Sequence, residues 1–512
     1  MRSILRAGAE SPSSKKRRLT TPASGRKTSP KVLLFPNNLY AQWRLESGAV
    51  LLLHEQNESP PERLLQAVWQ HQRFHRDHLT SLDGETLRVL HPGFVSREGG
   101  PDFRGAVIQF GGEPPRSGDV EVDVHAGGWI AHGHDRNAAF RDVILHVIWE
   151  GDRPARGAPP TLVLRDKLDA PLGELGLWLD SEDELAMPDN LRGRCCPALE
   201  TLSAEEKSRL LRDAAETRFR SKAEQLQARA RQAGWEQSLW EGLFRALGYK
   251  HNTWPMRRLA EQRPRWLAAS MSPIELQARL LGIGGLLPSE LTRSRAGADG
   301  YLRRVWDYWW RDREEFADCV LPASVWRFHG QRPANHPQRR LALAAHWLAS
   351  GKLIADIERW CTTDCPEGKA PGSLLETLQV TRDDFWSWHW TLRSARMARP
   401  QPLLGPARAT DLAVNVILPW LWIRAVEGKN KNLQGSIERR FQAWPAAEDN
   451  AVLRLARQRL LGGAPRRTLR CAAEQQGCIQ IARDFCDRSD ALCNDCRFPR
   501  LVGEFRKGSA PL

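Results

Sequence analysis

The stretch GDVEVDVH, residues 118–125, decides the fold of the first half of this chain. Side chains alternate between the two faces of a strand, so this stretch predicts a strand with three valines on one face and Asp119, Glu121, Asp123 and His125 on the other. Like charges two residues apart on one face repel, so this face is stable only if it is solvated, partly protonated, or neutralised by a cation or an arginine. A single divalent cation would neutralise several of these carboxylates at once. The alternative is the solvated face of an ordinary antiparallel strand.

The sequence just before this strand supplies a further carboxylate. Gly-Pro-Asp-Phe at 100–103 leads into a second predicted strand at 104–110, and a Gly111-Gly112 turn separates the two strands. If the hairpin turns tightly there, Asp102 lies opposite Glu121, close enough for both carboxylates to hold one Mg²⁺ or Mn²⁺. A longer turn shifts that register, and the sequence leaves both registers open.

Strand and helix patterns divide the chain into a mixed part and a helical part. Further strands are predicted at 86–90, 143–149 and 161–166, and an amphipathic helix at 62–74. After residue 192 the periodicity is helical, and capping boxes mark two helix starts, Ser203 with Glu206 and Ser272 with Glu275. The predicted fold is α+β, with a disordered basic tail at 1–35, an α+β domain at 36–190, a helical domain at 200–470 and a helix with a cysteine-rich metal-binding end at 471–512.

Charge and composition limit the class of protein. The chain has 75 Lys and Arg against 61 Asp and Glu, a net charge of +14, and 41% hydrophobic residues, which excludes a collagen-like, coiled-coil or wholly disordered chain. The first 31 residues carry nine Lys or Arg and one Glu, so most of the net positive charge lies in an N-terminal tail. This tail contacts nucleic acid or anionic lipid, or only aids solubility. No apolar run near the N-terminus suits a secretory signal, and the most apolar stretch, 413–423, is half a membrane span. We expect a cytoplasmic protein without a membrane partner.

Histidines near the acidic strand predict a competing metal site. His132 and His134 form a His-x-His pair beside Asp135, and His146 lies inside an otherwise apolar strand. Such a set can ligate Zn²⁺ or Mn²⁺. The alternative is a polar turn and a hydrogen-bonded core histidine.

The cysteines near the end of the chain predict a second metal centre. Cys478, Cys486, Cys493 and Cys496 have the spacing C-x7-C-x6-C-x2-C. Four thiolates converging from a helix and a Cys-x-x-Cys turn can bind structural Zn²⁺ or a 4Fe–4S cluster. The last three resemble three of the four cluster ligands of endonuclease III-type glycosylases, whose downstream fourth cysteine is absent here, so Cys478 would have to replace it. Free thiols are the alternative.

A basic segment at 326–340 mixes arginines with aromatic residues and prolines and leads into a predicted helix. Arginine forks match phosphate geometry, and a helix N-terminus adds a positive dipole. The segment therefore predicts nucleic-acid contacts by Arg327, Arg332, Arg339 and Arg340, or a linker that arginines pin to acidic partners.

The spacing of the carboxylates resembles the PD-(D/E)XK nuclease motif. It reads Pro101-Asp102, 18 intervening residues and then Glu121-Val122-Asp123. The resemblance implies a restriction-endonuclease-like mixed sheet in which Asp102 and Glu121 ligate a catalytic metal, and Glu62 lies where some members carry an extra ligand. Asp123 lies where the motif has Lys and cannot donate positive charge to a phosphate, so either another residue does so or the site is inactive.

Several segments together resemble the bacterial domain-of-unknown-function 2851 family. They include ERLLQAVW at 62–69, GPDF at 100–103, HGHD at 132–135 and RPANHPQRR at 332–340. The resemblance runs from about 36 to 500 and implies no activity. The sequence departs from that family at Asp123, where the family pattern has His, which weakens a mechanism built on position 123 but not the pairing of Asp102 with Glu121.

These patterns favour a metal-dependent nuclease, or a nuclease-derived nucleic-acid-binding protein, with Asp102 and Glu121 as ligands and Glu62 and Asp123 as auxiliary catalytic residues. A non-enzymatic interaction or scaffold protein, with protein partners that the sequence does not identify, is the second hypothesis. The third is a metallohydrolase of small phosphorylated substrates, which needs His132, His134 and His146 within about 2 to 2.2 Å of one ion.

Overall fold

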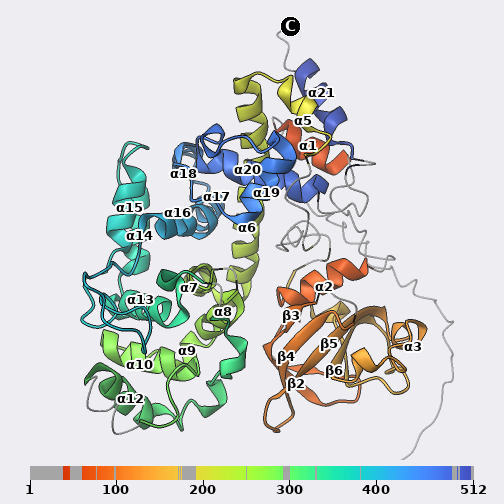
Figure 1. Ribbon diagram of the computed structural model, residues 1–512, viewed down its shortest axis with the longest axis vertical. Helices are drawn as coiled ribbons and strands as arrows, with labels where there is room; N and C mark the ends of the chain where they lie inside the picture. Colours follow the sequence, from red (N-terminus) through yellow and green to blue (C-terminus); the bar gives the residue numbers. More distant parts are fainter. Residues whose placement is uncertain are drawn as a thin grey trace, which may run out of the picture. The chain divides into compact units, whose positions relative to one another are not determined.

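The computed structural model describes residues 38–46, 60–76, 78–96, 100–170, 172, 175, 192–249, 251–291, 300–328, 331–380, 382–486, 493 and 496–508. The basic tail predicted at 1–35 lies outside these residues. Within them a mixed sheet is followed by a large helical region, so the fold is α+β, as the sequence predicts (Figure 1).

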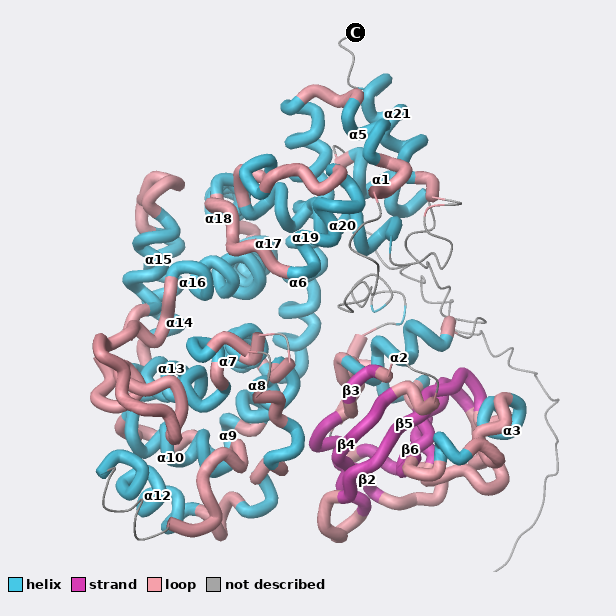
Figure 2. The backbone as a smooth tube through the Cα atoms, viewed as in Figure 1, coloured by secondary structure: helices cyan, strands magenta, loops and turns pink. Residues whose placement is uncertain are grey.

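The sheet is mixed, and its strand order places β5 in the middle. Among the described residues it has seven strands in the order β1-β2-β4-β5-β6-β7, with β3 paired to β4 (Figure 2). Neighbours from β1 to β5 are antiparallel, whereas β5, β6 and β7 are parallel. The strands are β1 (Leu79–Thr80), β2 (Thr86–His91), β3 (Phe94–Val95), β4 (Phe103–Phe110), β5 (Arg116–His125), β6 (Val143–Glu150) and β7 (Thr161–Val163). Because β5 and β6 are parallel, the chain crosses over between them, and the short helix α3 (Gly128–Ala131) lies in that crossover.

Helix α2 (Glu62–Gln70) covers the apolar side of β5. Its buried side chains include Leu65, Val68 and Trp69, the stripe that the 3.6-residue spacing predicts. They share one hydrophobic core with Val120 and Val122 of β5. The valine face of the predicted strand is therefore the core face, and Glu121 and Asp123 lie on the opposite one.

A bulge in β4 sets the register next to Asp102. Near the hairpin loop Ala106 pairs with Gly118, whereas Phe103 pairs with Val120, so β4 contains one extra residue between these pairs. Gly105, in the bulge, has φ +65, a conformation that glycine adopts without strain. The loop at 111–115 is longer than a tight two-residue turn, and the bulge compensates for its extra length. Asp102 consequently lies beside Glu121.

Most of the helical region follows residue 192 and uses the predicted start signals, and α1, from the N-terminal part of the chain, packs against it. Ser203 and Ser272 each form a complete capping box, with Glu206 and Glu275. The helices are α1 (Leu39–Glu46), α5 (Cys196–Glu200), α6 (Ala204–Ala233), α7 (Trp235–Leu247), α8 (Thr253–Glu261), α9 (Arg263–Trp266), α10 (Pro273–Ile283), α12 (Gly300–Asp312), α13 (Pro337–Ser350), α14 (Leu353–Thr362), α15 (Ala370–Leu378), α16 (Pro406–Leu412), α17 (Leu418–Glu427), α18 (Lys431–Ala443), α19 (Ala451–Leu461), α20 (Ala472–Cys486) and α21 (Phe498–Gly508).

The most apolar helical stretch belongs to the core of this region. A π-helical turn joins α16 to α17, and the resulting helix, Pro406–Glu427, is long and apolar enough to cross a membrane by length and composition. However, 72% of its most apolar window is buried inside the protein, as in a core helix of a globular protein. Trp420, in this helix, is fully buried and donates from its indole N–H to the carbonyl oxygen of Trp235 at the start of α7.

Candidate metal centre

Four chain segments bring acidic and imidazole side chains to one end of β5. Asp102 directly precedes β4, and Glu121 and Asp123 project from the middle of β5. His146 lies on β6 beside Glu121, and His132 and His134 follow α3 in the crossover. The parallel pairing of β5 with β6 therefore returns the crossover loop to the acidic face of β5.

Backbone and side-chain hydrogen bonds fix the pair Asp102 and Glu121. The backbone N–H of Asp102 donates to Glu121 Oε2 at 3.0 Å, and the N–H of Val122 donates to Asp102 Oδ2 at 3.1 Å. From α2, the Gln66 amide donates to Asp102 Oδ1 at 2.9 Å and to Glu62 Oε1 at 3.2 Å. Glu62 is thus linked to Asp102 through Gln66. The sequence analysis did not identify Gln66, and only its four-residue spacing from Glu62 could have suggested it.

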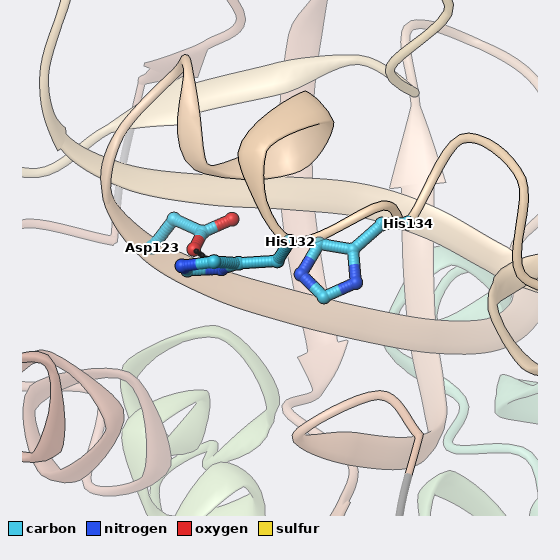
Figure 3. A group of neighbouring side chains, drawn as sticks. All are labelled: Asp123, His132 and His134. Carbon is cyan, nitrogen blue, oxygen red and sulfur yellow. Dashed lines mark ion pairs between the residues drawn. The ribbon is translucent and has the colours of Figure 1, made fainter.

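Asp123 and Glu121 each face an imidazole. Asp123 Oδ1 lies 3.1 Å from His132 Nδ1, and its Oδ2 lies 2.9 Å from His146 Nε2. Glu121 Oε1 lies 3.2 Å from His134 Nε2. Figure 3 shows the His132 ring reaching back toward the Asp123 carboxylate, with His134 beside it. The acidic and histidine sets, treated as competing sites in the sequence, therefore form one continuous site.

This acidic face is buried. The exposed fraction is 7% for Glu121 and 2% for Asp123, so the alternative of a solvated strand face does not hold. Gly128, at the start of α3, lies directly against Asp123, because a Cβ atom there would fall 2.4 Å from Asp123 Oδ1. The crossover covers the acidic face, and the absence of a side chain at Gly128 permits that approach.

Burial makes negative charge costly at this site. The pKa of the Glu121 carboxyl is raised to about 9, chiefly by burial and next by the charge of Asp102. Burial also raises the pKa of Asp102 to about 6, although hydrogen bonds from Val122 and Gln66 lower it. The pKa of Glu62 is raised by partial burial and by Asp123, and burial lowers the pKa of His134. Without a cation, the carboxyl groups of Glu121 and Asp102 therefore keep their protons to a higher pH than ordinary carboxyl groups do.

The donor set fits a metal ion. Asp123, His132 and His134 each offer a ligand atom, and these atoms all lie within 4.8 Å of one another. Both ring nitrogens of His134 are buried without a hydrogen-bond partner, although Nε2 lies close to Glu121. A buried imidazole without partners is costly, and ligation through one nitrogen would satisfy it. The histidine set predicted from the sequence is His132, His134 and His146. In the structure Asp123 takes the place of His146 in this group, and His146 contacts Asp123 instead.

Comparison with known proteins gives a family. The model of a family described as proteins of unknown function, DUF2851, matches residues 62–450. The chain belongs to this family. No curated protein and no solved structure gives a significant match. The DUF2851 match covers the sheet, the carboxylates and the histidines, and it ends before the cysteines at 471–496. It does not confirm the resemblance to PD-(D/E)XK nucleases.

Within the DUF2851 match, the structure corrects the predicted nucleic-acid contacts of Arg339 and Arg340. Both side chains are buried, with exposed fractions of 1% and 3%, and they donate to backbone carbonyl oxygens or to Asn335. Helix α13 begins at Pro337, so helical geometry turns these two arginines into the core. Arg327 and Arg332 are exposed. Arg327 lies over the Phe94 ring, and Arg332 is paired with Glu448.

The cysteines beyond the DUF2851 match are near one another but are not arranged around a single ion. None of the ten cysteines is part of a disulfide bond. Cys478 and Cys486 are buried, and Cys493 and Cys496 are half-buried. Among the residues that the structure describes, no three thiols have sulfur atoms within 4.8 Å of one another.

Proposed function

We propose that the site on β5 is a divalent metal centre that hydrolyses phosphodiester bonds, and that the protein is a metal-dependent nuclease. The observation that supports it is the juxtaposition of Asp102 and Glu121 on adjacent strands with Asp123, His132 and His134 in one site, in which Glu121 and Asp123 are buried. Buried carboxylates with raised pKa values are candidates for metal ligation, because a cation replaces the protons that they otherwise hold. The nuclease resemblance of the motif supports the reaction type.

The mixed donor set favours Mn²⁺ over Mg²⁺. Magnesium prefers an octahedron of oxygen ligands, whereas imidazole suits later transition metals. With Glu121 and Asp123 supplying oxygen and His132 and His134 supplying nitrogen, manganese matches both donor types. We therefore expect activity with Mn²⁺ to exceed activity with Mg²⁺.

We assign a separate role to each of the other residues at this site. A bound metal would lower the pKa of a water and stabilise charge that develops on the phosphate. Gln66 orients Asp102, and His146 orients Asp123 from the buried side of the site. The side chain of His132 is 53% exposed, so we propose that this ligand holds the metal at the solvent side of the site, where a scissile phosphate would approach.

Cleavage of labelled single-stranded, double-stranded and branched DNA and RNA tests the proposal. We expect the wild type to cut at least one substrate with Mn²⁺ and to lose activity in EDTA. Glu121→Gln should lower the rate at least 100-fold, whereas His125→Ala should retain it, because His125 lies on the same strand but is exposed and contacts Glu150. Equal rates for wild type and Glu121→Gln would exclude this site as the catalytic one.

A metallohydrolase of small phosphorylated substrates is the second candidate. The group Asp123, His132 and His134 favours it, because two imidazoles and a carboxylate also form a hydrolytic metal site. Hydrolysis of bis-p-nitrophenyl phosphate and p-nitrophenyl phosphate separates the candidates. A nuclease prefers the diester, whereas rapid cleavage of the monoester with no cleavage of nucleic acid would favour the second candidate.

A further inference from the structure

The segment before α5 meets the cysteine-rich end of the chain at Arg459. The carbonyl oxygen of Arg459, near the end of α19, accepts from Gly193 N at 2.9 Å and lies 3.2 Å from Cys196 Sγ and 3.9 Å from Cys195 Sγ. The guanidinium of Arg459 donates through Nη2 to Cys493 Sγ at 3.2 Å. One buried residue therefore joins thiols that are about 300 residues apart in the sequence. Helices α5, α19, α20 and α21 lie close together there (Figure 1).

Cys195 belongs to the group of thiols at the C-terminal end. Burial raises the pKa of the Cys195 thiol, and Cys486, Cys196, Cys496 and Cys493 lie near enough to raise it further. The pKa of Cys486 is raised to about 12, mainly by burial, with Cys496 and Cys493 again among its neighbours. Cys195, Cys486 and Cys496 also contribute to one hydrophobic core, to which Cys478 belongs as well. The environment is apolar, and Cys195 shares it with Cys196, Cys486, Cys493 and Cys496.

Cys478 is poorly placed to join them. It lies eight residues before Cys486 on the same helix, α20, which separates the two backbones by about 12 Å at 1.5 Å per residue. Among the described residues, Cys486 is the thiol that raises the pKa of Cys478, with Arg457 lowering it and Asp449 raising it. Cys195 approaches from a different element.

We propose that Cys195, Cys486, Cys493 and Cys496 are the four ligands of a 4Fe–4S cluster. A tetrahedral zinc ion with Zn–S bonds of about 2.3 Å needs its sulfur ligands roughly 3.8 Å apart. Among the described residues no three thiols lie within 4.8 Å of one another, so they are not gathered as closely as the ligands of one zinc ion would be. The spacing Cys486-x6-Cys493-x2-Cys496 supplies three ligands from one segment, and Cys195 supplies the fourth.

Arg459 gives the cluster a counter-charge. Ligation deprotonates the thiols, so the ligand set carries negative charge in an apolar environment. The Arg459 guanidinium, donating to Cys493 Sγ, offsets that charge and forms the kind of N–H···S contact that tunes such clusters. Cys196 is left out of the proposed ligand set, because its Sγ lies closer to the Arg459 carbonyl oxygen, at 3.2 Å, than the Sγ of Cys195 does, at 3.9 Å.

Metal analysis of the full-length protein tests this inference without reference to nuclease activity. Protein prepared without oxygen should contain about four iron and four sulfide per chain and show visible absorption that dithionite bleaches. Cys195→Ser should lower the iron content to less than a third. Cys478→Ser and Cys196→Ser, two buried cysteines nearby, should retain it. Far-ultraviolet circular dichroism of all three variants separates cluster loss from unfolding, and if Cys195→Ser is unfolded, Cys195→Ala and Cys493→Ser replace it.

Three outcomes would overturn the inference. Iron loss in Cys478→Ser with retention in Cys195→Ser would restore Cys478 as the fourth ligand. One zinc per chain in place of iron would exclude the cluster. Protein that binds neither metal after anaerobic reconstitution with iron and sulfide would show that these cysteines are free thiols.

Discussion

Glu121 holds a proton in the metal-free protein at neutral pH, because its pKa is raised from 4.5 to about 9. In the unfolded chain the same carboxyl ionises near its ordinary pKa. Between these two values the folded state therefore binds a proton that the unfolded state has lost, and the free energy of unfolding falls as the pH rises. A bound cation requires the ionised carboxylate, so metal affinity rises with pH over the same window.

Glu121→Gln should therefore stabilise the metal-free protein. The amide can still accept from the N–H of Asp102 but has no charge to bury. In EDTA at about pH 8 we expect the free energy of unfolding of Glu121→Gln to exceed that of the wild type by on the order of 1–3 kcal/mol, and the difference to shrink toward pH 5. Urea unfolding at both pH values measures it. A wild-type stability that does not change with pH would show that Glu121 is already ionised in the folded state.

At the scale of elements, alternation along β5 predicts the acidic face and the capping boxes predict helix starts, because both depend on neighbours in sequence. The bulge at Gly105 and the return of the crossover to β5 could not be predicted, since they depend on contacts between strands. His132 and His134 were therefore found as candidates, but not as neighbours of Glu121 and Asp123. The nearness of Cys195 to Cys486 could not be predicted for the same reason, because no sequence spacing links the two residues.

Helix α3 provides a test of that crossover. Gly128→Ala places a Cβ atom against the Asp123 carboxylate, which is held by His132 and His146 and cannot swing away freely. We expect α3 to shift and the affinity for Mn²⁺ to fall about 10- to 100-fold, as for the loss of an orienting contact around a metal ligand. Titration calorimetry measures it. Gly127→Ala is the matched control, since its Cβ atom meets nothing within 4 Å, and equal losses in both variants would argue against the contact with Asp123.

At the scale of the whole molecule, buried arginines connect distant parts of the helical region. Arg339, on α13, donates through Nη2 to the carbonyl oxygens of Gln401 and Pro402 and through Nη1 to those of Trp386 and His389. It therefore pairs four backbone carbonyl groups of the long irregular segment 386–402, which also makes turn hydrogen bonds of its own. Its burial lowers its pKa to about 10, which leaves it charged at neutral pH.

Arg339→Met should therefore destabilise the fold without a specific effect on nucleic-acid binding. It leaves several buried carbonyl groups unpaired, and we expect a loss of about 2–4 kcal/mol in the free energy of unfolding, measured with urea. Arg332→Ala removes an ion pair with Glu448 in which both side chains are exposed, so its effect on stability should stay within about 0.5 kcal/mol. If Arg339→Met unfolded at the wild-type urea concentration but bound DNA more weakly, Arg339 would have to reach the surface in solution, and the buried position described for it would be wrong.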